Sequence, residues 1–199
     1  MGVTKGFGPD AVQAAREAGL RDLGENYAAE LLEKAGAAPG DEGRDESEIW
    51  HFLGAIQRNK VPSLAPLVGV WQSVAREVEG VRIARFAPGA AVMVQVDVTG
   101  LPGRNGCAPS DVPELVERLR ALGLVVLGLM TVAAPGTGAA EAAFNQVVRL
   151  ADRLGLPERS LGMSDDLEAA VAAGSTMVRI GRALFGDRPP RVSPHARGL

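Results

Sequence analysis

The feature that most constrains the fold is a regular alternation of short apolar runs with longer amphipathic runs along the chain. The short runs are rich in β-branched residues, whereas the longer runs have the Ala, Leu, Glu and Arg content and the apolar spacing of helices. This alternation predicts parallel strands joined by helical crossovers. Eight strands are expected, near Met1–Lys5, Arg21–Glu25, Ile49–Gly54, Val70–Val74, Ala90–Val98, Val125–Met130, Arg159–Met163 and Thr176–Ile180.

Eight strand–helix units close into a (β/α)8 TIM barrel, which is the α/β fold predicted here. An open, doubly wound sheet is the alternative, but no Gly-x-Gly-x-x-Gly pattern follows the first strand, which argues against a dinucleotide-binding fold. We expect a single barrel domain over residues 1–188 and a disordered tail, rich in Pro and Arg, over 189–199. The charged stretch Ala37–Glu48 is predicted to be a solvated loop.

Helices are expected between these strands. Pro62 is predicted to kink or break one of them, and Asp165 and Glu168 have the spacing of a capping box. The predicted helices are Asp10–Ala18, Asn26–Ala35, Gln57–Leu67, Arg76–Phe86, Val112–Leu122, Ala139–Leu154, Asp165–Ala173 and a last turn at Arg182–Phe185.

Charge and cysteine content restrict the partners. The net charge of −3 gives no general attraction to nucleic acid or to an anionic membrane, and no apolar run is long enough to span a bilayer. The single cysteine, Cys107, excludes a disulfide framework and a cysteine-based metal cluster, and no other metal-ligand cluster is present in the sequence. A reducing cytoplasm is the expected compartment.

Two consecutive glycine-containing turns near the end of the chain point to a ligand. They lie in Leu161–Asp166 and Gly174–Gly181, each at a strand end that opens into a helix. In a (β/α)8 barrel, the loops after the last two strands are the usual phosphate site. These turns therefore predict a phosphate cradle.

Lys5 ends the first strand, where partial burial would favour the neutral amine that attacks a carbonyl group. Alone, it reads most simply as a surface lysine. In a closed barrel, however, the first strand neighbours the eighth, so Lys5 would lie beside Arg179 and the Ile180–Gly181 turn. One ligand that carries both an aldehyde and a phosphate is pyridoxal 5′-phosphate (PLP), and we take it as the expected cofactor.

Other polar residues have two interpretations each. Arg179 would donate a hydrogen bond to the cofactor's ring nitrogen and leave the ring unprotonated, a poor electron sink; the alternative is a salt-bridged arginine at the barrel mouth. Asn26 would hold a ligand oxygen or cap the next helix. His51, inside an apolar strand, is expected to be a hydrogen-bonded core residue.

These residues fall in motifs that resemble the pyridoxal-phosphate homeostasis protein family, whose fold is that of the alanine racemase barrel without its second domain. The motifs cover nearly the whole chain in the family's order, and the last of them is long and specific. They are Val3–Lys5, Gly24–Tyr27, Trp50–Gly54 with Gln57, Asn59 and Lys60, Gly128–Met130, and Leu161–Gly186.

The resemblance implies that Lys5 forms a Schiff base with PLP and that Arg179 faces the ring nitrogen. It implies that Ser164, with the turns at Gly162–Met163 and Ile180–Gly181, holds the phosphate, and that Asn26 lies close to the cofactor. It also implies a binding protein for PLP homeostasis, without clear catalytic turnover, which buffers the cofactor or delivers it to PLP-dependent apoenzymes. Family members normally carry a helix before the lysine motif, whereas this sequence begins almost at the lysine.

Three other functions stay open from the sequence. A PLP-dependent racemase or lyase needs a second acid or base on the opposite ring face, and the only tyrosine in the chain is Tyr27. An aldolase-like barrel would use Lys5 directly on a phosphosugar carbonyl. An inactive paralogue would be kept for protein contacts.

Overall fold

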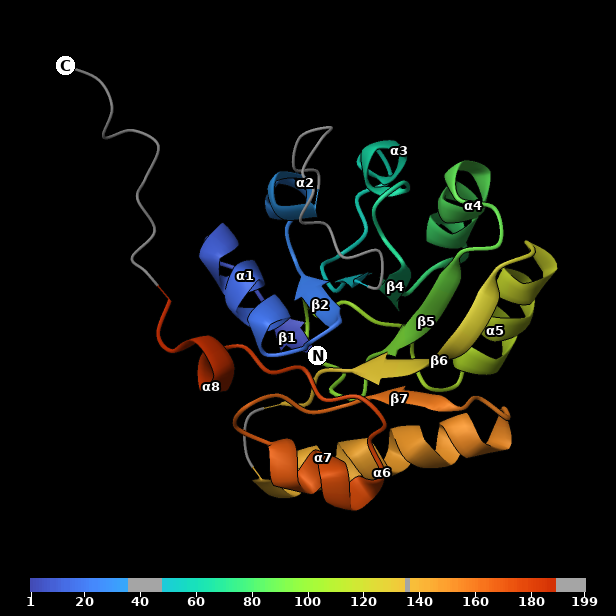
Figure 1. Cartoon of the computed structure of the whole chain (residues 1–199). Coiled ribbons are helices and arrows are strands. Elements are labelled where there is room, and N and C mark those ends of the chain that lie inside the picture. Colours follow the sequence, from blue (N-terminus) through green and yellow to red (C-terminus); the bar gives the residue numbers. More distant parts are fainter. Residues whose placement is uncertain (36–47, 135–136, 189–199) are drawn as a thin grey trace.

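The computed structural model describes residues 1–35, 48–134 and 137–188. Its strands form one parallel sheet whose spatial order is the order of the sequence, which confirms the predicted alternation. The sheet curls around a central axis and the helices lie outside it (Figure 1). The strands are β1 (Gly2–Val3), β2 (Asp22–Glu25), β3 (Ile49–Phe52), β4 (Val70–Val74), β5 (Ala91–Val96), β6 (Val125–Thr131) and β7 (Glu158–Ser160).

The segment 176–180 closes the barrel between β7 and β1. Its hydrogen bonds alternate between the two neighbours. Met177 accepts from Leu161 N at 3.1 Å on the β7 side, whereas Ile180 accepts from Val3 N at 2.8 Å on the β1 side. The predicted eighth strand is thus present as two isolated bridges, Ser160 to Met177 and Gly2 to Ile180, rather than as a regular ladder. A (β/α) barrel is therefore the fold.

The helices cover the outer face of the barrel (Figure 1). Apolar side chains from the sheet and from the helices pack between them, with Trp71, Leu119 and Phe144 fully buried. Such two-sided burial is typical of parallel strands. The helices are α1 (Pro9–Glu17), α2 (Ala28–Ala35), α3 (Val61–Leu64), α4 (Glu77–Phe86), α5 (Val112–Ala121), α6 (Thr137–Arg153), α7 (Leu167–Ala173) and α8 (Arg182–Phe185).

Two helix predictions need correction. The expected helix 57–67 is reduced to α3, and Pro62 lies in its first turn. Proline has no backbone N–H, which is tolerated in the first turn of a helix but not at later positions, where the N–H is needed for a hydrogen bond. The predicted capping box of Asp165 and Glu168 does not form. Asp165 instead pairs with Arg182 at 2.8 Å, and Asp166 is the residue that precedes α7.

Some predictions concern residues outside the described ranges. The expected tail 189–199 lies wholly outside them, and so does the loop Ala37–Glu48 apart from Glu48, which forms an ion pair with Arg16. Within the described part of the chain, no helix is both long and apolar enough to cross a membrane.

Candidate cofactor-binding site

A pocket of about 200 Å³ opens at the end of the barrel where the strands finish. Its lining comes from both ends of the chain, because segment 176–180 lies beside β1. Six of the eight residues predicted for the site line it: Lys5, Asn26, Met163, Ser164, Arg179 and Gly181. Gly162 and Ile180 are outside the lining but belong to the adjacent backbone.

Lys5 follows β1 and points its half-buried side chain into this pocket. Burial lowers the pKa of the amine, and the positive charges of Arg188 and Arg179 lower it as well, while Tyr27 and Glu25 act in the opposite direction. A lowered pKa increases the fraction of neutral amine at a given pH, and the neutral amine is the nucleophilic form.

Arg179 is 5% exposed and is held in place by the backbone of two strands. Its Nη1 donates to the carbonyl oxygen of Ser160 at 2.5 Å, and its Nη2 donates to the carbonyl oxygen of Thr131 at 2.7 Å. Burial lowers its pKa to about 10, which leaves the group cationic at neutral pH. The sequence alternative of a salt-bridged arginine is wrong for the described residues, since no carboxylate pairs with this guanidinium.

A chain of hydrogen bonds runs from Arg179 into the barrel interior; we call it the interior relay. Ser160 Oγ accepts from Arg179 Nη1 at 2.9 Å and donates to Gln72 Oε1 at 2.7 Å. Gln72 Nε2 lies 2.8 Å from His51 Nδ1, and His51 Nε2 lies 2.9 Å from Asp22 Oδ1. The relay therefore joins Arg179 to Asp22, which is at the opposite end of the barrel, where β2 begins.

The guanidinium sets the direction of the interior relay because arginine only donates. Ser160 accepts from it and donates to Gln72, so the amide nitrogen of Gln72 donates to His51 Nδ1. We infer that His51 is neutral and carries its proton on Nε2, which donates to Asp22. Burial lowers the pKa of His51 against the influence of Asp22, in agreement with the neutral form. The prediction of a hydrogen-bonded core histidine is confirmed.

The two glycine-containing turns meet at the pocket. Ser164 and Gly181 both line it, and within the described residues neither of their backbone N–H groups has a hydrogen-bond acceptor. The N–H of Met163 already donates to Asp166 Oδ1 at 2.5 Å. Gly162 has a φ of +87°, and a Cβ there would lie 2.3 Å from that of Ala170, so the turn requires glycine.

Asn26 lines the pocket directly after β2, which favours its interpretation as a ligand-binding residue. Its backbone passes very close to the end of β3. A Cβ at Gly54 would lie 1.9 Å from the carbonyl oxygen of Asn26, so only glycine permits this approach. The Trp50–Gly54 motif thus supports the position of Asn26.

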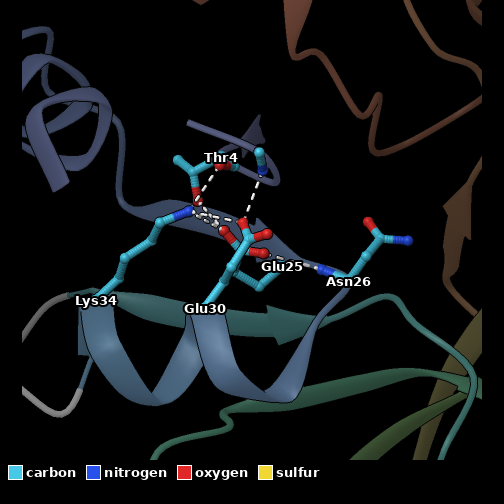
Figure 2. A network of polar contacts seen from close by, with 6 residues as sticks. Thr4, Glu25, Asn26, Glu30 and Lys34 are labelled. Atoms are coloured by element: carbon cyan, nitrogen blue, oxygen red, sulfur yellow. Dashed lines mark hydrogen bonds and ion pairs between the residues drawn. The ribbon is translucent and has the colours of Figure 1, made fainter. Parts of the chain in front are cut away.

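Three charged side chains, two of them buried, lie at the turn that carries Lys5, and Figure 2 shows their contacts. Lys34 on α2 forms ion pairs with Glu25 at 2.5 Å and with Glu30 at 3.2 Å, and its own side chain is 2% exposed. Glu25 Oε1 accepts a hydrogen bond from Thr4 Oγ1 at 2.8 Å. We call Glu25, Glu30 and Lys34 the α2 cluster.

Sequence reasoning missed the α2 cluster and part of the pocket lining. The spacing of Glu30 and Lys34 by four residues was a visible signal, but it is also common on exposed helix faces. Arg182 and Arg188 add positive charge to the lining, with Asp165 beside Arg182. In the ranges that the structure covers, no group of three or more His, Cys, Asp or Glu residues is placed to hold a metal ion.

The fold and the pocket define a class of protein. Residues 1–189 match the family model described as alanine racemase, N-terminal domain. A solved structure of PipY from Synechococcus elongatus, described as having PLP bound, superimposes with a TM-score of 0.83 at 30% identity and covers 94% of this chain and 91% of that chain. The likeness extends over nearly the whole barrel.

Two relatives in sequence share a name. A pyridoxal phosphate homeostasis protein from Pseudomonas aeruginosa is 41% identical over 197 residues, which cover 94% of this chain and 84% of the relative. The protein of that name from Deinococcus radiodurans is 39% identical, covering 93% of this chain and 87% of its own length. The chain belongs to the pyridoxal phosphate homeostasis protein family, within the alanine racemase N-terminal domain group, as the sequence motifs predicted.

Proposed function

We propose that this protein binds PLP through a Schiff base to Lys5 and acts in PLP homeostasis, by buffering or delivering the cofactor without catalytic turnover. The observation that carries the proposal is that Lys5, Arg179, Ser164 and Gly181 line one pocket although they come from opposite ends of the chain. PLP-dependent apoenzymes are the proposed recipients.

The residues present fit this cofactor by their chemistry. The amine of Lys5 matches an aldehyde, and the free N–H groups of Ser164 and Gly181, with the Ser164 hydroxyl, match a phosphate. Arg179 has five N–H donors and uses three of them on Ser160 and Thr131, which leaves two for a ring nitrogen. When bound, PLP would supply an electron sink, and an arginine donor at the ring nitrogen would weaken it.

An absorbance spectrum tests the proposal. Wild-type protein mixed with PLP should show the band of a protein-bound Schiff base, and borohydride should fix the cofactor on Lys5. The Lys5→Ala variant should lose that band and keep weak binding through the phosphate. A variant with the wild-type spectrum would show that another amine carries the aldehyde. Wild-type protein whose mixture with PLP gives only the spectrum of free PLP would refute the proposal.

A PLP-dependent racemase or lyase is the second candidate, since the matching family model is that of a racemase domain. Tyr27 is the available acid or base, but it is 45% exposed and is not among the residues that line the pocket in the described structure. Deuterium exchange at the α-carbon of amino acids tests this candidate. Exchange no faster than with free PLP would remove it.

A further inference from the structure

The backbone on both sides of Lys5 is fixed by side chains of one helix, α2. The carbonyl oxygen of Thr4 accepts a hydrogen bond from Lys34 Nζ at 2.7 Å, and the N–H of Gly6 donates to Glu30 Oε2 at 2.7 Å. These two groups belong to the peptide units directly before and after Lys5. Figure 2 shows Lys34 and Glu30 reaching from α2 to this turn.

The same cluster also fixes the backbone of Asn26. Glu25 Oε1 accepts hydrogen bonds from Lys34 Nζ and from Thr4 Oγ1. Glu25 Oε2 accepts a hydrogen bond from the N–H of Asn26 at 3.1 Å. The Lys5 and Asn26 backbones are therefore supported by one set of charges. An ordinary ion pair four residues apart on a helix face would not need these buried contacts to a neighbouring loop.

We propose that Glu30 and Lys34 are positioning residues, which hold the Lys5 amine where it can reach a bound aldehyde. This inference rests on the proposed function and deepens it. Neither side chain lines the pocket in the described structure, so both act through the backbone of Lys5.

The reaction that needs this positioning is the condensation of the Lys5 amine with the aldehyde, which requires no further reactant. The nitrogen lone pair of neutral Lys5 forms a bond to the aldehyde carbon, and the aldehyde oxygen leaves as water with the two amine hydrogens. The rate depends on how often the amine is held within reach of the carbon. A displacement of about 1 Å can slow such a step by about 100-fold.

Charge alone does not explain the contact of Glu30 with the turn. The charged and titratable groups with the largest influence on the pKa of the Lys5 amine are Arg188, Tyr27, Arg179 and Glu25. Glu30 is not one of them, although its carboxylate accepts from Gly6. Its removal should therefore change the position of Lys5 more than its protonation.

The test compares three variants of helix α2 in the full chain. Glu30→Ala removes the acceptor of the Gly6 N–H. Glu30→Gln removes the charge but keeps an amide oxygen that can accept from Gly6. Glu33→Ala is the matched control, because Glu33 is an exposed acid on the same helix. Thermal unfolding confirms that each variant is folded.

Two ligands separate positioning from general damage to the pocket. The first is PLP, for which the rate of Schiff-base formation is followed by absorbance. The second is pyridoxine 5′-phosphate, which has an alcohol in place of the aldehyde and so reports binding without the covalent step. We expect Glu30→Ala to slow Schiff-base formation by about 10- to 100-fold while the Kd for pyridoxine 5′-phosphate changes by less than about threefold.

Glu30→Gln and Glu33→Ala should both form the Schiff base at a rate within about threefold of the wild type. Equal rates in Glu30→Ala and wild type would overturn the inference, and so would equal losses for the two ligands, which would indicate a purely structural role. If Glu30→Ala is unfolded, the double variant Lys34→Met/Glu25→Gln, which lacks the donor to Thr4, takes its place with the same expected result. A wild-type protein that forms no Schiff base would instead refute the proposed function.

Discussion

The two sides of the pocket are supported by different physical means. The Lys5 side rests on the α2 cluster, in which one buried ammonium, that of Lys34, pairs with two carboxylates. The Arg179 side rests on the interior relay, whose middle members, Ser160, Gln72 and His51, are neutral. Buried charges hold a position strongly but depend on their partners, whereas a neutral relay depends on the direction of each hydrogen bond.

The two supports also respond to pH with opposite signs. Burial raises the pKa of Glu25 above its ordinary 4.5. Between pH 4.5 and the raised value, the native state therefore holds a proton that the unfolded state has lost. The stability that this proton contributes is lost as the pH rises through the raised pKa. Burial lowers the pKa of His51 below its ordinary 6.5, so the unfolded state takes up the proton first, and stability is lost as the pH falls below 6.5.

The largest effect is expected from Lys34→Met. This change leaves the carboxylate of Glu25, whose side chain is fully buried, without its cation and should reduce the free energy of unfolding by about 3–5 kcal/mol. Urea unfolding at pH 7 measures it. The double variant Lys34→Met/Glu25→Gln should recover much of the loss, because no charge is then left unpaired at that position. If the double variant is as unstable as Lys34→Met, the Lys5 side of the pocket does not depend on the pairing of buried charges.

A smaller effect is expected from Gln72→Leu in the interior relay. The change removes the acceptor of the Ser160 hydroxyl and the donor to His51 Nδ1, and it should cost about 1–3 kcal/mol of unfolding free energy. Gln146→Leu, on the exposed face of α6, is the control and should stay within about 0.5 kcal/mol of the wild type. Equal losses in the two variants would show that the relay contributes nothing specific.

The smallest effect is expected from Asp22→Asn at the partly exposed end of the relay. The amide oxygen still accepts from His51 Nε2, so the free energy of unfolding at pH 7 should change by less than about 1 kcal/mol. Loss of the negative charge should lower the pKa of His51 further, because Asp22 raises it in the wild type. The acid-side loss of stability should then extend to lower pH.

NMR titration of the imidazole measures this last prediction, with His51→Gln to assign the signal. A pKa for His51 that rises in Asp22→Asn would contradict the influence of the Asp22 charge on the imidazole.

Local sequence patterns predicted the elements well where the chain decides its own conformation. The alternation of strands and helices predicted the parallel order of the sheet. The helix expected over 57–67 was too long, because Pro62 lies in the first turn of the short α3 and not within a longer helix. The capping box at Asp165 did not form, because α7 begins after Asp166, and the Asp165 carboxylate pairs with Arg182 instead. The α2 cluster was missed because its contacts join residues up to 30 positions apart, which no local pattern reports.

The sequence by itself determined the barrel class, the family and six of the residues that line the pocket, because strand–helix alternation and long motifs are local properties of the chain. Only the tertiary structure decided what supports those residues. The buried ion pairs around Lys5 and the direction of the relay behind Arg179 exist because closure of the barrel excludes water from groups that are distant in sequence, and each excluded group then has to find its partner within the fold.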